Sequence, residues 1–304
     1  MSGLITKMVI FVALMVTGYV FARHNEGSGA FTKAASSLVI NVFMCATILN
    51  SVLTAGLTMS LGELGRVMLV VCTAIGTGYA VAAVAARLLP IEREHRAGFE
   101  LLMAVPNSMF ITLPVVEELF GPVAVFYCGV SNIPFNLLLY TYGIWRLRRG
   151  EDGEKFRIKD MFGAPLISTL VSIFIFAAGI PVPQPVKELV GTMAGATMPL
   201  SMIVIGASLS TVSLFDAFRN WRFYLSSFIK LMITPVLAWF LCGLLTADPI
   251  LRTTGALIAA SPSAIIVTVL TIKHNGDAIF TSEGILHSTA LAMLTIPMLV
   301  YFFL

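Results

Sequence analysis

Three ionisable side chains stand in stretches of the chain that are otherwise apolar. Lys230 lies nine residues into the apolar segment 221–245, and Glu283 and His287 lie four residues apart in the segment 278–303. A lysine at the centre of a bilayer costs roughly 2.5–3.5 kcal/mol on insertion scales, so Lys230 needs a compensating partner if its segment crosses a membrane. Two interpretations are open. Lys230 is the counter-charge of a bound anion, or it snorkels or donates structural hydrogen bonds to the carbonyls of a broken helix.

Glu283 and His287 share one face of a helix, because residues four apart are neighbours on a helical surface. Histidine changes charge near neutral pH, so this pair has the chemistry to carry a coupling proton. The competing interpretation is a structural polar pair at the cytoplasmic end of the helix. Lys230, Glu283 and His287 are therefore the candidate coupling residues.

Two apolar stretches carry a proline beside small polar residues, "AVPNSMFITLP" at 104–114 and "AASPSAIIVTVLTI" at 259–272. Proline removes a backbone donor and clashes with the carbonyl one turn earlier, so we expect the helices to break at Pro106 and Pro262. A break inside a membrane is tolerated where it is buried in protein or lines a cavity. The polar residues expected to satisfy the freed backbone groups and to line the gap are Asn107, Ser108, Ser261 and Ser263.

Each break also leaves free the N-terminus of the helix half that follows it. The N–H groups there carry a partial positive charge, which favours a bound anion. We therefore predict a substrate-binding site for an anion at the two breaks, with Pro106 and Pro262 in its wall. The alternative is that both prolines are simple helix kinks.

A third proline stands between two asparagines in the stretch "SNIPFN" at 131–136. Asn132 and Asn136 are four residues apart, so both amides lie on one helix face. Facing a cavity, they can hydrogen-bond a carboxylate or complete a cation site. Otherwise they are interhelical contacts, typically worth only about 0.6 kcal/mol each. We include both in the predicted substrate site.

The elements that would position these residues are membrane-spanning helices. The chain has 304 residues, of which 58% are hydrophobic and 12% charged, whereas soluble domains carry about 25% charged residues. Its apolar runs approach the length of about 20 residues that a helix needs to cross a bilayer. We expect an all-α integral membrane protein with ten spans, at 4–22, 34–57, 66–88, 97–119, 122–145, 161–180, 189–211, 221–245, 253–272 and 278–303.

The distribution of lysine and arginine predicts the orientation of these spans. Fourteen basic residues follow the odd-numbered spans and four lie on the other side, so both termini are expected outside and the loop 146–160 inside. This loop separates five spans from five, and an odd number in each half forces the halves to run in opposite directions, as in inverted-repeat transporters. Pro106 and Pro262 stand at matching places in the two halves, about 13 Å deep from opposite sides. The broken fourth and ninth helices are therefore expected to cross near the midplane.

Four stretches carry a resemblance to a known family: "VALMVTGYVFA" from residue 12, "MPLSMIVIGASLS" from residue 198, "KLMITPVLAW" from residue 230, and "PNSMFITLPVVEELFGPVAVFYCGVSNIPFNLLLYTYGIW" from residue 106. With them the chain resembles the auxin efflux carrier family over nearly its whole length. That family contains the bacterial relatives of the plant PIN transporters, and it shares a fold with the bile acid sodium symporters.

The resemblance implies two inverted five-helix repeats, a scaffold that dimerises, and a transport domain that moves in an elevator-like way. The implied parts are scaffold helices at 1–60 and 161–211, transport-domain helices at 61–145 and 212–304, and the cytoplasmic loop 146–160. It also adds an interpretation of Lys230, as a fixed cation standing where sodium sits in the sodium-coupled relatives.

The expected function is secondary active transport of a small organic anion, such as a dicarboxylate or an auxin-like acid, across the cell membrane. An anion channel and a ligand-sensing receptor on a transporter fold are the alternatives. An enzyme is not expected, because the sequence has no HExxH, Walker A or GxSxG motif. We expect no cofactor, metal site or nucleic-acid partner; the expected partners are the lipid bilayer, protons or sodium as coupling ion, and a second copy of the chain.

Overall fold

The computed structural model describes residues 2–25, 28–54, 60–147, 163–210, 218–274 and 276–303. In this part of the chain every regular element is helical and no strand is present, as predicted for an all-α protein. The predicted loop 146–160 lies outside the described residues from position 148 onward.

Six helices are long and apolar enough to cross a membrane, and a multi-pass membrane protein is thereby confirmed. They span Ala30–Ser51, Gly62–Leu88, Pro122–Leu147, Gln184–Ala207, Trp221–Gly243 and Ala278–Phe303, with shorter apolar helices at Val9–His24 and Ala164–Ile175. The remaining two predicted segments, 97–119 and 253–272, are interrupted at their prolines, so neither forms one continuous helix.

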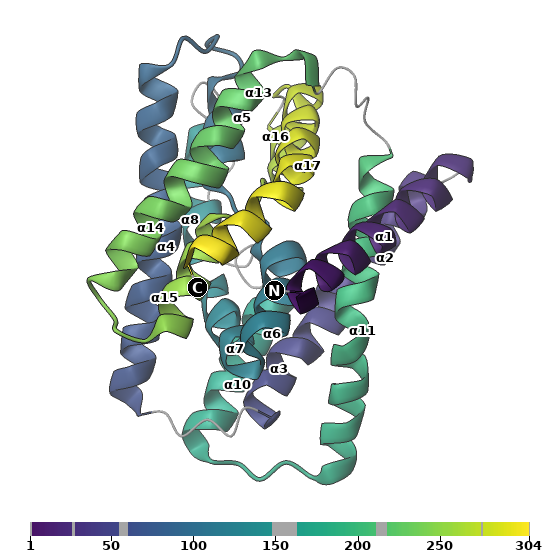
Figure 1. The fold of residues 1–304 in the computed structure, drawn as a ribbon, viewed down its shortest axis with the longest axis vertical. Helices are drawn as coiled ribbons and strands as arrows, with labels where there is room; N and C mark the ends of the chain where they lie inside the picture. The colour runs from purple at the N-terminus through teal and green to yellow at the C-terminus, as the bar shows by residue number, and fades with distance from the viewer. Residues whose placement is uncertain are drawn as a thin grey trace. The chain divides into compact units, whose positions relative to one another are not determined.

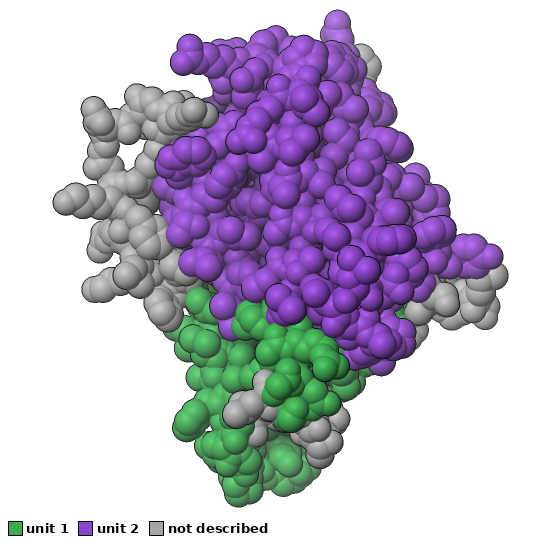
Figure 2. Space-filling model, turned by 90° about the vertical axis from the view of Figure 1, so that its left-hand side faces the viewer, with its two compact units in different colours: residues 1–68, 109–132, 162–211 green, residues 69–108, 133–161, 212–304 purple. Residues whose placement is uncertain are grey.

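The described chain divides into two compact units (Figure 2). Unit 1 comprises residues 1–68, 109–132 and 162–211, and unit 2 comprises residues 69–108, 133–161 and 212–304. The division into scaffold and transport domain stays a prediction.

Unit 1 is built around the packing of its first and last helices. Its elements are α1 (Ser2–His24), α2 (Ser28–Leu38), the π-helical segment η1 (Val39–Phe43), α3 (Met44–Thr54), α6 (Leu113–Phe120), α7 (Pro122–Val130), α10 (Ala164–Ala178) and α11 (Gln184–Leu209). A Cβ on Gly18 would lie 2.0 Å from the carbonyl oxygen of Ile203, and one on Gly206 would lie 1.8 Å from that of Met15. Glycine at these positions therefore lets α1 and α11 approach backbone to backbone, as small residues do in membrane helix pairs.

Unit 2 contains both helix breaks. The helices before the two breaks, α5 and α15, are labelled in Figure 1. Its elements begin with α4 (Leu61–Leu88, from residue 69), α5 (Arg96–Ala104), α8 (Asn132–Leu138, from residue 133), η3 (Leu139–Gly143) and α9 (Ile144–Leu147). They continue with α13 (Trp221–Phe228), η5 (Ile229–Ile233), α14 (Thr234–Gly243), α15 (Pro249–Ala259), α16 (Ile266–Lys273) and α17 (Ala278–Phe303). The π-helical segment η2 (Ser108–Thr112) starts at the edge of this unit.

Candidate functional site

The two predicted helix breaks are confirmed, and they are hydrogen-bonded to each other. Helix α5 ends at Ala104 and helical structure resumes at Ser108, while α15 ends at Ala259 and α16 begins at Ile266. Between these ends the backbone of Pro106 pairs antiparallel with that of Ser263. The amide of Asn107 donates to the Pro262 carbonyl at 2.8 Å.

The amide of Ala264 donates in turn to the Val105 carbonyl at 3.2 Å. Backbone groups that the breaks leave without a helical partner thus bond to each other instead. Because both stretches stay buried, this mutual pairing satisfies groups that would otherwise be costly to leave unbonded.

The serines beside Pro262 donate hydrogen bonds to further backbone carbonyls, as predicted. The Ser263 hydroxyl donates to the Leu102 carbonyl at 2.5 Å, and the Ser261 hydroxyl donates to the Leu257 carbonyl at 3.3 Å. The Ser263 amide donates to the Ser288 hydroxyl oxygen at 3.2 Å, which links the second break to α17. Sequence reasoning missed Ser288, although its position directly after His287 was a signal that could have drawn attention to it.

Asn107 and Ser108 are both buried beside the first break, with 7% and 3% of their surfaces exposed. The Asn107 amide nitrogen of the main chain is the group that bonds the second break. Its side chain and that of Ser108 remain candidate ligands of a bound molecule.

Lys230 is buried against the end of α5. Only 2% of its surface is exposed, and its Nζ donates to the carbonyls of Met103 at 2.8 Å and Val105 at 3.3 Å. The ammonium therefore lies at the C-terminal end of a helix, where the backbone carries a partial negative charge. The interpretation of Lys230 as a donor to broken-helix carbonyls is the one the structure shows, and a bound anion as an additional partner is left for experiment.

The two asparagines fall on either side of the boundary between the units. Asn132 belongs to unit 1, where its Nδ2 donates to the Gly129 carbonyl at 3.0 Å and contacts the Met109 sulfur at 3.3 Å. Asn136 belongs to unit 2 and is half-buried. Their role in the predicted site stays a prediction.

His287 is fully buried and faces α13. Its Nδ1 lies 2.9 Å from the Ser227 hydroxyl, and the rings of Tyr224 and Phe218 lie 4.5 Å and 5.0 Å from its own ring. Its Nε2 is buried and makes no hydrogen bond within the described part of the chain. Glu283, one turn earlier on α17, is half-buried. The proposal that these two residues carry a coupling proton is not tested by these contacts.

A buried ion pair that was not predicted ties α5 to α9. Glu100 is 2% exposed, and its Oε2 lies 2.5 Å from Nη2 and 2.6 Å from Nε of Arg146. The Tyr142 hydroxyl also donates to Glu100. The sequence placed Glu100 in a span and Arg146 in a loop, and nothing in their spacing of 46 residues indicated the pair.

The chain is a multi-pass membrane protein of the broken-helix class. It has helices long enough to cross a bilayer, and its two helix breaks are buried and hydrogen-bonded to each other. Comparison with known proteins names the family. The model of the membrane transport protein family matches residues 4–156 and 151–300, so the chain belongs to this family of auxin efflux carrier-like transporters. The resemblance seen in the sequence is thereby confirmed.

Two archaeal relatives cover nearly the whole chain. An uncharacterized transporter of Methanothermobacter thermautotrophicus is 26% identical over 302 residues, which are 96% of each chain. The uncharacterized transporter MJ1031 of Methanocaldococcus jannaschii is 23% identical over 303 residues, again 96% of each. The chain is thus similar along its full length to proteins described as transporters.

Proposed function

We propose that this membrane transporter is a secondary active carrier of a small organic anion, such as a dicarboxylate or an auxin-like acid. It works by elevator-type alternating access in the cell membrane. The observation that carries the proposal is the antiparallel pairing of Pro106 with Ser263, because it brings the two broken segments together inside one compact unit. Paired broken helices are the means by which other transporters bind substrate at membrane depth.

The chemistry of the paired breaks favours an anion. Helical structure resumes at Ser108 after the first break and at Ile266 after the second, so the N-terminal ends of two helical segments, with their partial positive charge, begin close to the paired segments. The Lys230 side chain places its Nζ at the Val105 carbonyl, and in its protonated form it adds a positive charge there. The proposed site consists of Pro106, Asn107, Ser108, Asn132, Asn136, Lys230, Ser261, Pro262 and Ser263.

The proposed architecture has ten membrane-spanning helices in two inverted five-helix repeats, with the breaks crossing at the midplane and both termini outside. The scaffold comprises residues 1–60 and 161–211 and associates with a second copy of the chain. Residues 61–145 and 212–304 move as the transport domain. Lys230, Glu283 and His287 are the proposed coupling residues, with a proton or sodium as the coupling ion.

The experiment is a thermal-shift screen of the purified chain against a panel of carboxylates, repeated with and without sodium and between pH 5 and 8. A bound ligand raises the melting temperature by mass action, so at least one carboxylate should do so in a saturable manner. The neutral amide of the same carbon skeleton is the matched control. Equal stabilisation by acid and amide for every skeleton would contradict an anion site.

Uptake of the best ligand into proteoliposomes then separates a carrier from the alternatives. A carrier saturates with substrate and is driven by a proton or sodium gradient. Single-channel conductance would identify a channel, and binding without any flux would identify a receptor.

A further inference from the structure

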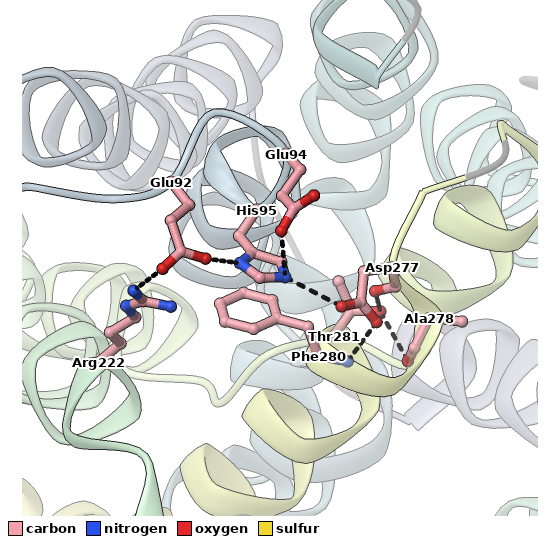
Figure 3. Close-up of polar contacts among 8 residues, drawn as sticks. All are labelled: Glu92, Glu94, His95, Arg222, Asp277, Ala278, Phe280 and Thr281. Carbon is pink, nitrogen blue, oxygen red and sulfur yellow. Dashed lines mark hydrogen bonds and ion pairs between the residues drawn. The ribbon is translucent and has the colours of Figure 1, made fainter.

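A histidine surrounded by carboxylates joins the starts of three helices in unit 2 (Figure 3). His95 directly precedes α5. Its Nε2 lies 3.0 Å from Oδ2 of Asp277 and 3.8 Å from Oε1 of Glu94, and its Nδ1 lies 3.0 Å from Oε2 of Glu92. The side chain of His95 is only 15% exposed, whereas those of the three acidic residues around it are 41% to 76% exposed.

The His95 ring packs on an aromatic side chain, and its neighbour Glu92 forms an ion pair with Arg222. The ring stacks on Phe280 with ring centroids 4.5 Å apart and planes inclined by 13°. Glu92 also lies 2.5 Å from Nη2 of Arg222. Asp277 precedes α17 and accepts a hydrogen bond from the Phe280 amide at 2.9 Å. The cluster therefore connects the segment before α5 to α13 through Arg222 and to α17 through Asp277.

The protonation state of His95 decides how many of these contacts are attractive. Carboxylates only accept hydrogen bonds, and a neutral imidazole has one N–H and one lone pair. Nε2 hydrogen-bonds Oδ2 of Asp277, whereas Nδ1 lies 3.0 Å from Oε2 of Glu92 but makes no hydrogen bond within the described part of the chain. A neutral ring can therefore still donate to Asp277, but only an imidazolium carries a charge that attracts all three carboxylates.

The charged residues around the His95 ring are mostly acidic. Glu92, Glu94 and Asp277 are negative, and Arg222 neutralises one of them through Glu92. The hydrogen bond from Arg222, followed by its charge and by His95, lowers the pKa of Glu92, so this carboxylate stays ionised when a histidine titrates. Two further basic residues lie close to the cluster in the sequence and would disfavour a positive charge on His95. They are Arg96, which follows His95, and His274, which lies three residues before Asp277.

We propose that His95 is a pH-operated clamp: its protonated ring ties the starts of α5 and α17, and loss of the proton loosens the tie. Helices α5, α13 and α17 pack on one another. Helix α5 carries the Leu102 and Met103 carbonyls, α17 carries Ser288, and Lys230 lies in η5, which directly follows α13. The clamp thus acts on the elements that form the candidate site. It stands independently of the transported substrate.

The test is a double-mutant cycle on the full chain with His95→Gln, Asp277→Asn and the combination, measured as melting temperature at pH 6 and pH 8. Asparagine keeps the cap at the start of α17 and removes the charge. The ion pair between His95 and Asp277 is present when His95 is protonated, and as pH rises it is reduced to a hydrogen bond from a neutral ring. Wild type should therefore exceed each single variant by about 2 °C at pH 6, with a clearly smaller advantage and a clearly smaller coupling between the two sites at pH 8.

His24→Gln is the control, because within the described residues the His24 ring hydrogen-bonds a carbonyl four residues earlier, at 2.9 Å, and pairs with no carboxylate. Its melting curve should follow that of wild type at both pH values. If His95→Gln does not fold, the comparison of Asp277→Asn with wild type decides alone. A wild-type advantage of equal size at pH 6 and pH 8, or no coupling at pH 6, would overturn the clamp.

Discussion

The Nζ of Lys230 donates a 2.8 Å hydrogen bond to the carbonyl of Met103, 127 residues away in the chain. This contact joins η5 to the last turn of α5, beside the place where α5 breaks. A buried ammonium is stable only with such partners, and a helix end has carbonyls that need donors. The hydrogen bond therefore satisfies both the buried Lys230 nitrogen and the Met103 carbonyl, and it fixes the lysine beside the breaks.

Replacement of Lys230 by methionine should weaken binding of a carboxylate by about 10- to 150-fold, since loss of a charged partner costs about 1.5–3 kcal/mol. Equilibrium binding and melting temperature are measured together, because Lys230→Met also deprives the Met103 carbonyl of its donor. Ser263→Ala is the matched control: it deprives the Leu102 carbonyl of a donor without changing charge. Ser263→Ala and Asn107→Ala should therefore weaken binding less.

Wild-type affinity in Lys230→Met would show that the lysine is only a structural donor. If Lys230→Met, Ser263→Ala and Asn107→Ala all bind the carboxylate with wild-type affinity, the anion site does not lie at the breaks.

Gly206→Ala should destabilise unit 1, because the new methyl would stand 1.8 Å from the Met15 carbonyl oxygen and would force α1 and α11 apart. Overpacking of this kind costs about 1–3 kcal/mol or more. Gly195→Ala in the same helix meets nothing within 4 Å and should leave the melting temperature unchanged or raise it. Equal melting temperatures for the two variants would contradict the close crossing of these helices.

Glu100→Gln should cost about 3–5 kcal/mol of stability, since it leaves the Arg146 guanidinium without its buried partner. Replacing both residues, as Glu100→Gln with Arg146→Met, should recover much of this loss because no unpaired charge remains. Unfolding in increasing denaturant is measured for Glu100→Gln, for Arg146→Met alone and for the double variant. Additive losses in the double variant would show that the pair does not interact energetically.

His287→Gln should flatten the pH dependence of uptake while leaving ligand binding largely intact, if His287 carries the coupling proton. The measurement is proteoliposome uptake between pH 5 and 8, with equilibrium binding recorded beside it. His24→Gln provides the control for an unrelated histidine. An unchanged pH profile would return His287 and its contact with Ser227 to a structural role.

The proposed topology predicts that a cysteine introduced at either terminus is labelled by a membrane-impermeant reagent added from outside. A cysteine in the loop 146–160 should be labelled only after the membrane is opened. The four native cysteines are replaced first, so that every signal comes from the introduced position. Labelling of the C-terminus from inside would remove the basis for two oppositely oriented halves.

Several features of this protein could be predicted from the sequence because their causes are local. Apolar runs of membrane length predict helices wherever they occur, and a proline breaks its own helix through its missing N–H group. Pro106 and Pro262 were therefore located correctly without any tertiary information. The family could also be predicted, because its sequence pattern runs along most of the chain.

Only the tertiary structure decided which groups meet at these breaks. The Lys230 side chain contacts the Met103 carbonyl, the Ser288 hydroxyl contacts the Ser263 amide, and Glu100 pairs with Arg146. Each contact joins segments far apart in the sequence, and helical periodicity says nothing about such pairs. The cluster around His95 was missed for the same reason. In the sequence Glu92, Glu94 and Asp277 are ordinary charged residues of two loops, and it is the packing of α5 against α17 that brings their charges to one imidazole.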